Sequence, residues 1–227
     1  TCRATYVAKT SGTQKDDSIE CYHDRIRESV LAHLSSAQLI HIHTRLAAAF
    51  DQVQGEDADA YTMVRHQIGA GNHQRAAEVA EAAAGKAAVG MAFLQSAELY
   101  ALTLKVGSFS EEKERVLRLR WADVLVNSGK GKQAGDLYLA AAEGMGEEER
   151  LRLELLAGSQ FLYAGYTEEG LAALDKVMTD IGETMPKSSK GALISLLWNR
   201  GKLKLRGPKW EERNESSISS EEMRRLD

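Results

Sequence analysis

One spacing of small residues after glycine recurs three times in this chain and restricts the folds open to it. In each copy, small or apolar residues follow the glycine at five, nine and twelve positions. These offsets fit the second helix of a helical hairpin, where small side chains let neighbouring helices approach closely. The copies are Gly71 with Ala76, Ala80 and Ala83, Gly129 with Ala134, Tyr138 and Ala141, and Gly165 with Gly170, Leu174 and Val177. The pattern predicts an array of paired helices.

The distances between the copies are similar to those of tetratricopeptide repeats. Gly129 and Gly165 lie 36 residues apart, close to the tetratricopeptide period. Gly71 and Gly129 lie 58 residues apart, which predicts an additional helix between them, at 90–106. We therefore expect an irregular tetratricopeptide-like array over 53–227 that is cut short at its C-terminal end. Such arrays stack hairpins into a continuous core and leave one surface free for a protein partner.

The first 52 residues follow a different pattern. Residues 2–9 and 18–23 alternate in the manner of strands and predict a β-hairpin, and helical periodicity begins at Asp24. A hairpin beside helices is similar to the wing of a winged-helix domain. The predicted fold is mostly α, with an N-terminal β-hairpin that ends a winged-helix domain over 1–52, followed by the irregular helical array.

A second helix is expected after Ser35 or Ser36, either of which can cap it. Its predicted apolar face consists of Leu39, Ile42, Leu46 and Phe50.

Farther along, the runs EEKER and GEEERLRLE are typical of solvated helix starts, because acidic side chains favour the positive end of the helix dipole. Three aromatic residues of the array are predicted to lie in the core, and Tyr163 is left open between core and surface. The three are Trp121, Tyr138 and Phe161.

Composition excludes several classes of partner. A net charge of −4 and a pI near 5.9 give no general attraction for nucleic acid or acidic lipid. No apolar run is long enough for a membrane span, and no signal peptide begins the chain. We therefore expect a cytoplasmic protein that binds no membrane, with nucleic acid an unfavoured partner.

Its thiols, Cys2 and Cys21, are expected to be free. The strand-like start without Met and the charged end suggest a piece of a longer protein.

His23 and Asp24 stand where the strand-like segment gives way to a helix. The start of a helix exposes unpaired N–H groups and a positive dipole, so an adjacent imidazole can add a donor toward a phosphate. The competing interpretation is structural. Asp24 would then cap the helix, and His23 would pack against the wing.

Several separated segments together resemble one protein family. They are YHDRIRESVLAHL, IHTRLAAAF, HQIGAGNHQRAAEVAEAAAGKAA and FLQSAELYALTL, with LKLRG and SISSEEMRRLD near the end. This string is similar to the region after the ATPase core in bacterial STAND-type signal-transduction ATPases. It most resembles the very large members that join a serine/threonine protein kinase, a predicted ATPase and tetratricopeptide-like repeats. The likeness covers nearly the whole chain.

The resemblance implies a role for the histidine at the junction. In the family, a Met-His-Asp motif closes the winged-helix domain, and its histidine contacts the phosphate of bound ADP. His23 and Asp24 match the last two positions, whereas Tyr22 replaces the methionine. The resemblance thus implies a nucleotide-sensing site at His23 and Asp24. ATP or ADP with Mg²⁺ is expected in the parent protein, bound by the ATPase core of the same chain, and no cofactor is expected in the residues here.

Catalytic and metal-binding motifs are absent from the sequence. No Walker A loop occurs, and GKGK at 129–132 has the wrong spacing and reads as a turn between helices. Kinase signatures and a nucleophile elbow are also missing. His41 and His43 would point in divergent directions on a helix, so with His33 they predict no metal site. This part of the protein is not expected to be an enzyme.

Three functions remain open from the sequence. By resemblance, the chain is a regulatory and scaffolding segment of a multidomain signalling ATPase or kinase, which couples partner sensing by the repeats to a nucleotide switch. Alternatively, it is a stand-alone tetratricopeptide-like adaptor. As a third possibility, it is a winged-helix transcriptional regulator, supported only by one basic cluster. That cluster comprises Arg3, Lys9, Lys15, Arg25 and Arg27.

Overall fold

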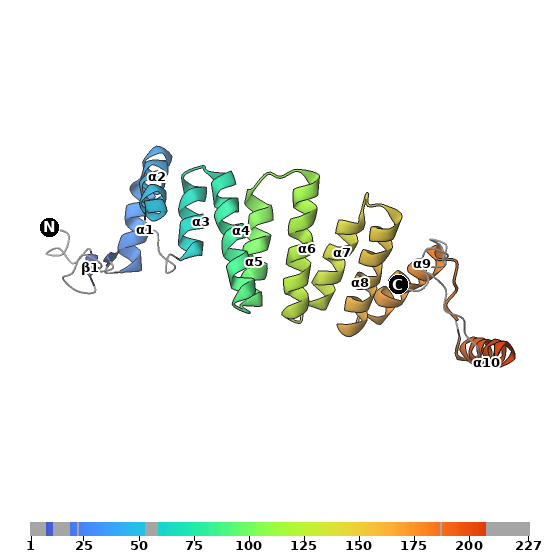
Figure 1. The fold of residues 1–227 in the computed structure, drawn as a ribbon. Coiled ribbons are helices and arrows are strands. Elements are labelled where there is room, and N and C mark those ends of the chain that lie inside the picture. Colours follow the sequence, from blue (N-terminus) through green and yellow to red (C-terminus); the bar gives the residue numbers. More distant parts are fainter. Residues whose placement is uncertain (1–7, 11–18, 22, 53–58, 187, 208–227) are drawn as a thin grey trace. The chain divides into compact units, whose positions relative to one another are not determined.

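The computed structural model describes residues 8–10, 19–21, 23–52, 59–186 and 188–207. These residues are mostly α-helical, which confirms the predicted fold class at that level (Figure 1). The helices are α1 (Asp24–His33), α2 (Ser36–Gln52), α3 (Ala60–Gly69), α4 (His73–Val89), α5 (Phe93–Val106), α6 (Glu111–Asn127), α7 (Gly131–Ala142), α8 (Glu147–Tyr163), α9 (Thr167–Asp180) and α10 (Ser189–Arg206). Within the described ranges, no helix is both long and apolar enough to span a bilayer.

A short antiparallel pair of strands precedes the helices. Strand β1 (Ala8–Thr10) pairs with β2 (Ile19–Cys21), with Lys9 opposite Glu20. The described part of the predicted hairpin is therefore two strands of three residues each. Residues 2–7, 18 and 22 of this prediction, Cys2 included, lie outside the described residues. The Cys21 thiol is free, as predicted, and exposed.

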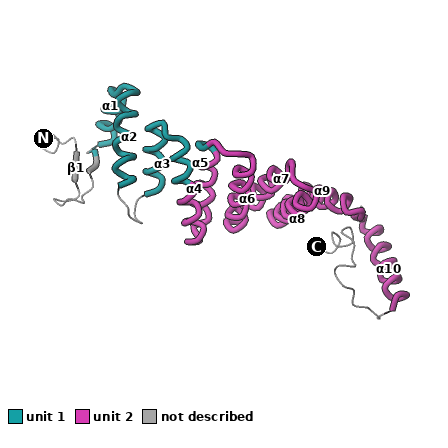
Figure 2. The backbone as a smooth tube through the Cα atoms, turned by 45° about the horizontal axis from the view of Figure 1, so that its top comes forward, with its two compact units in different colours: residues 1–80, 105–107 teal, residues 81–104, 108–227 magenta. Residues whose placement is uncertain are grey.

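The chain divides into two compact units (Figure 2). Unit 1 contains residues 1–80 and 105–107, and unit 2 contains residues 81–104 and 108–227. Helix α4 therefore begins in unit 1 and ends in unit 2. The predicted domain boundary lies between residues 52 and 53. Because residues 53–58 are outside the described residues, this boundary stays a prediction.

Five of the described helices, α3, α4, α6, α8 and α9, end in the same kind of turn. At each of five turns, the N–H of a residue with positive φ donates to the carbonyl three residues back, and the next N–H donates to the carbonyl five residues before it. This pair of hydrogen bonds defines the Schellman motif, which reverses the chain and satisfies carbonyls at the helix end. The residues with positive φ are Gly71, Met91, Gly129, Gly165 and Gly182. The turn expected within GKGK is confirmed at Gly129.

A small buried residue follows four of these turns at the same distance. In each case the next helix begins two residues after the turn residue, and the small residue comes three positions later. The four are Ala76, Ser96, Ala134 and Gly170, and all are buried. The predicted spacing is confirmed at its three glycines, although Ala83 and Leu174 are only half-buried. The predicted additional helix is α5, and it carries a fourth copy that starts at Met91.

The helix starts and most of the predicted core agree with the sequence. Helices α6 and α8 begin inside the two acidic runs, and the Ser110 hydroxyl accepts a hydrogen bond from the Lys113 N–H at the start of α6. Tyr138 and Phe161 are buried, as predicted. Trp121 is only half-buried, and Tyr163 is 85% exposed, which places it on the surface.

In unit 1, helix α2 begins as predicted but packs through a different face. The Ser35 hydroxyl accepts from the Gln38 N–H, and the Gln38 side chain accepts from the Ser35 N–H, which forms a capping box. The predicted apolar face is confirmed at Leu39 and Phe50, which are half-buried, and wrong at Ile42 and Leu46, which are 40% and 38% exposed. The residues of α2 that are at least half-buried are Leu39, His43, Ala47 and Phe50.

Met91 provides a test of the turn, because a left-handed conformation is costly for a residue with a Cβ. Its φ is 59°, and its side chain is 78% exposed, so replacement loses little packing. We expect Met91→Gly to raise the free energy of unfolding in urea by about 1 kcal/mol. The matched reverse change, Gly129→Met, should lower it by about the same amount. A destabilised Met91→Gly variant would contradict the role assigned to this turn.

Candidate protein-binding groove

Helices α7, α8 and α9 of unit 2 border an open groove. Glycines let the helices approach: a Cβ at Gly135 would lie 2.6 Å from the Phe161 ring, and one at Gly170 would lie 2.7 Å from the Leu162 side chain. The groove has a volume of about 380 Å³. Its lining residues are Asp136 and Leu139 of α7, Glu154 and Phe161 of α8, and Glu169, Ala172, Ala173 and Lys176 of α9. Small residues therefore both bring the helices together and leave the hollow between them.

The floor of the groove is ionic at one end. Glu154 is 4% exposed, and its carboxylate accepts hydrogen bonds from Arg150 at 2.9 Å and from Lys176 at 2.6 Å. Arg150 also forms an ion pair with Asp180 at 2.9 Å, and this contact is the largest cause of its raised pKa. A buried carboxylate must be paired to remain charged. The network therefore satisfies Glu154 and joins α8 to α9.

At the other end, acidic residues line the groove together with Phe161, and Lys132 lies beside them. Asp136 and Glu169 are exposed on opposite sides, on α7 and α9. Lys132 Nζ lies 3.0 Å from the Asp136 carboxylate, 5.7 Å from the centre of the Phe161 ring and 5.4 Å from that of Tyr166. The hydrogen bond to Asp136 raises the pKa of Lys132, and Glu169 adds to the effect. This end has the chemistry that attracts a cation.

A buried tyrosine supports α7 at the groove. Tyr138 donates a hydrogen bond from its hydroxyl to the Asp123 carboxylate of α6 at 2.7 Å. Burial raises the pKa of Tyr138, and the bond to Asp123 raises it further. The phenol is protonated at physiological pH with or without this shift, and its bond to Asp123 fixes α7 against α6. Asp123 itself is exposed, so this polar contact lies at the edge of the core.

The predicted nucleotide-sensing residues lie at the start of α1, as the sequence indicates. His23 is exposed and takes the N-cap position, and its carbonyl accepts from the N–H groups of Ile26 and Arg27. Asp24 is the first residue of the helix and forms an ion pair with Arg27 at 3.4 Å. The capping role considered for Asp24 is therefore wrong, because His23 occupies that position. The role of His23 toward a phosphate stays a prediction.

A histidine pair in unit 1 was missed by the sequence analysis. The Nδ1 atoms of His43 in α2 and His66 in α3 lie 3.0 Å apart, and the Phe50 ring stacks on His66 with centroids 5.5 Å apart. The His43 ring also covers Gly69, where an added Cβ would lie 2.4 Å from it. The pair joins α2 to α3. Among the described residues, no group of three His, Cys, Asp or Glu side chains is placed to hold a metal ion.

The pair is expected to make unit 1 sensitive to acid. His66 is 8% exposed, and burial lowers its pKa below 6.5, with further lowering by His43 and Arg65. The bond between the Nδ1 atoms requires a proton on one nitrogen and a free lone pair on the other, so two imidazolium rings would break it.

The expected pH dependence follows from the direction of that shift. As pH falls through 6.5, the unfolded state takes up a proton before folded His66 does, so the stability of unit 1 falls. We expect the free energy of unfolding to decrease between about pH 7 and about pH 5. His66→Asn should flatten this decrease, because the other histidines remain in both proteins. An equally steep decrease in the variant would contradict the role of the pair.

Comparison with known proteins gives no relative. The chain matches no model of a known protein family, no curated protein and no solved structure. The groove and its charges are therefore the basis for a function, together with the resemblance carried by the sequence.

Sequence reasoning also missed the groove itself. Its residues were each visible: Glu169, Ala172 and Lys176 follow Gly165 at helical spacing, and Asp136 follows Gly129. What the sequence does not reveal is that Phe161, predicted as core, forms the floor between two acidic rims. A search for acidic residues on the second helices of two successive hairpins could have found it.

Proposed function

We propose that this chain is a regulatory and scaffolding segment of a multidomain signal-transduction ATPase or serine/threonine kinase. In this proposal, helices α6–α9 bind a protein partner, and the region around His23 belongs to a nucleotide switch. The observation that carries the partner-binding part is the α7–α9 groove, with its aromatic floor and acidic rims on a repeat-like array. The kinase, the ATPase core and the cytoplasmic location rest on the sequence resemblance.

The array has the properties of a binding surface. Its helices are held by buried small residues and by the Glu154 network, so the groove exists before any partner arrives. A preformed site avoids the entropic cost of ordering on binding. Over α6–α9, from Glu111 to Asp180, fourteen acidic and nine basic residues give a net charge of −5. A partner that places basic side chains in the groove is therefore favoured electrostatically.

The mechanism would be a shift between two states. A partner that binds the array more tightly in the open form of the switch would favour that form by its difference in affinity. His23, at an exposed helix start, would stabilise the closed form by donating to the phosphate of ADP. As a stand-alone adaptor, the chain would use the same groove without any nucleotide.

Charge reversal tests the partner site. Peptides selected from a displayed random library on the intact chain should be rich in Lys and Arg, and Asp136→Lys with Glu169→Lys should weaken their binding about tenfold or more. The matched control is Glu112→Lys with Glu148→Lys, which changes net charge equally at exposed positions outside the groove lining. Equal weakening in both variants would show that the groove has no special role.

The nucleotide switch is tested in the intact parent protein. His23→Ala should speed the release of ADP about tenfold, as expected for the loss of one hydrogen bond to a charged phosphate. His41→Ala is the control, because His41 is exposed in the neighbouring helix α2. Unchanged ADP retention in His23→Ala would exclude the sensing role and favour the adaptor.

A further inference from the structure

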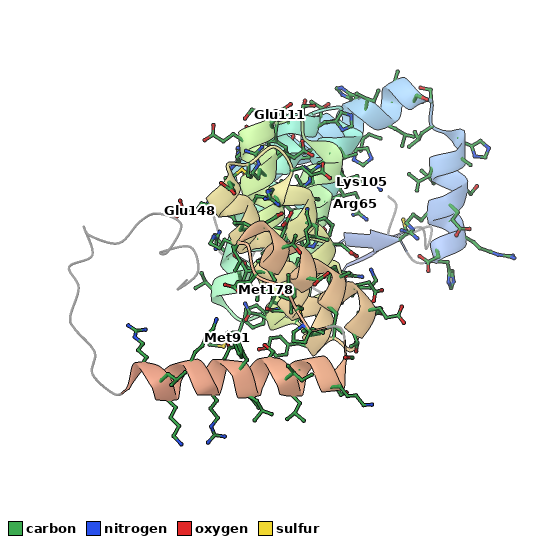
Figure 3. The ribbon with its side chains drawn as sticks, turned by 90° about the vertical axis from the view of Figure 1, so that its right-hand side faces the viewer. Arg65, Met91, Lys105, Glu111, Glu148 and Met178 are labelled. Atoms are coloured by element: carbon green, nitrogen blue, oxygen red, sulfur yellow. The ribbon has the colours of Figure 1, made fainter. Side chains whose placement is uncertain are left out.

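Helix α10 exposes apolar side chains to an unusual extent. None of its residues is buried, and seven large apolar side chains are 56–91% exposed. They are Leu193, Ile194, Leu196, Leu197, Trp198, Leu203 and Leu205. Figure 3 shows side chains projecting from opposite sides of this helix. An exposed apolar surface of this kind is typical of a site that packs against another part of the protein or a partner.

The net charge of α10 is opposite in sign to that of helices α6–α9. It contains no acidic residue and five basic ones, a net charge of +5, whereas α6–α9 carry −5. Four of the five basic residues lie in the second half of the helix, after an apolar first half. The five are Lys190, Arg200, Lys202, Lys204 and Arg206.

The order of residues on α10 also fits the groove. The α9 residues that line the groove, Glu169, Ala172, Ala173 and Lys176, have spacings of three, one and three. One face of α10 carries the same spacing in Leu193, Leu196, Leu197 and Arg200. Residues at these intervals share one face of a helix.

An antiparallel pairing brings the two rows into register. If Ser189 lies level with Asp180, equal rise along both helices places Leu196 and Leu197 beside Ala173 and Ala172. The same register places Arg200 beside Glu169. Apolar residues thus meet the small residues of the groove, and the basic half meets its acidic end.

We propose that α10 is a strap that closes over the α7–α9 groove of its own chain and that a partner must displace it. Eight residues, 181–188, connect α9 to α10, within the range of ordinary connections between antiparallel helices. A tether this short gives an effective concentration in the millimolar range, which favours the groove of the same chain over that of a second copy. The strap also defines the partner class as a basic helix with an apolar face. This inference deepens the proposed partner-binding function and rests on the groove assigned there.

Disulfide trapping in the full chain tests the closure. With Cys2 and Cys21 replaced by Ser, Ala172→Cys with Leu197→Cys should form an intramolecular disulfide about tenfold faster than Ala172→Cys with Ser195→Cys. Ser195 is the control because it lies on the opposite side of α10 from Leu197. Both α10 positions lie on one exposed helix, and Ala172 is exposed, so folding should be preserved. Rates are followed by non-reducing electrophoresis and the bond by mass spectrometry.

Charge reversal then tests the ionic part of the strap. Arg200→Glu should slow the trapping severalfold, and adding Glu169→Lys should restore it, because the pair regains opposite charges. Hydrogen exchange of the unaltered chain gives a second readout, in which high salt should speed exchange in α10. Equal trapping at Leu197 and Ser195 would overturn the strap, as would products that are mainly disulfide-linked dimers, which would place α10 on a second copy.

The closure and the proposed function can fail separately. Disulfide trapping is measured without any peptide. If no disulfide forms but peptides still bind in a groove-dependent way, the strap is excluded and the proposed partner site stands. If the disulfide forms rapidly but no peptide binds in a groove-dependent way, α10 covers the groove only as a structural element. That result would exclude the proposed partner site. If both hold, Arg200→Glu should tighten the binding of a selected basic peptide several times over.

Discussion

The close approach of helices across a Schellman turn is the constraint on which the rest of this structure depends. At four of the five turns, the left-handed residue reverses the chain in a fixed number of residues, so the position three places into the next helix meets its neighbour. Only a small side chain fits there, and Ala76, Ser96, Ala134 and Gly170 occupy it. In Ser96, the hydroxyl also donates to the Ala84 carbonyl at 2.8 Å, which satisfies the one polar atom that this choice buries.

The groove is a consequence of the same constraint. Gly135 and Gly170 bring α7 and α9 close to α8, and Ala172 and Ala173 then leave space that larger residues would fill. Because the space is bounded by helix surfaces, its rims carry the solvent-facing residues of those helices, which here include Asp136 and Glu169. An array that packs through small residues therefore acquires an open and charged surface between its helices without a dedicated loop.

Much of the fold could be predicted from the sequence, because the spacing after glycine reports directly on the turn and the small buried position. The copy at Met91 was hidden, since the conformation is the same but the residue that signals it is not glycine. The packed face of α2 was predicted wrongly for a related reason. Periodicity assigns Ile42 to the packed face and His43 to the surface. The half-buried position of His43 becomes acceptable because His66 supplies a hydrogen bond and Gly69 leaves room for the ring. Both facts belong to another helix, and a pattern within α2 cannot contain them.

The residues of the candidate site could be identified singly in the sequence, but the site itself could not be predicted. It depends on which charged residues lie close together in the fold. Lys132 illustrates this best. In the sequence it is one lysine of a glycine-rich turn, but in the fold its ammonium group lies near two aromatic rings, bonds to the Asp136 carboxylate and is influenced by the charge of Glu169. In the proposed complex, a basic partner residue would compete with this lysine for the Asp136 carboxylate. Because Lys132 is held at the exposed rim by Asp136 and can rotate into solvent, a stronger or better-placed cation could replace it at little cost. In such a site the charge of Asp136 is partly neutralised when no partner is bound, and the proposed selection would depend on how well the incoming basic residue also covers the apolar side chains of the groove.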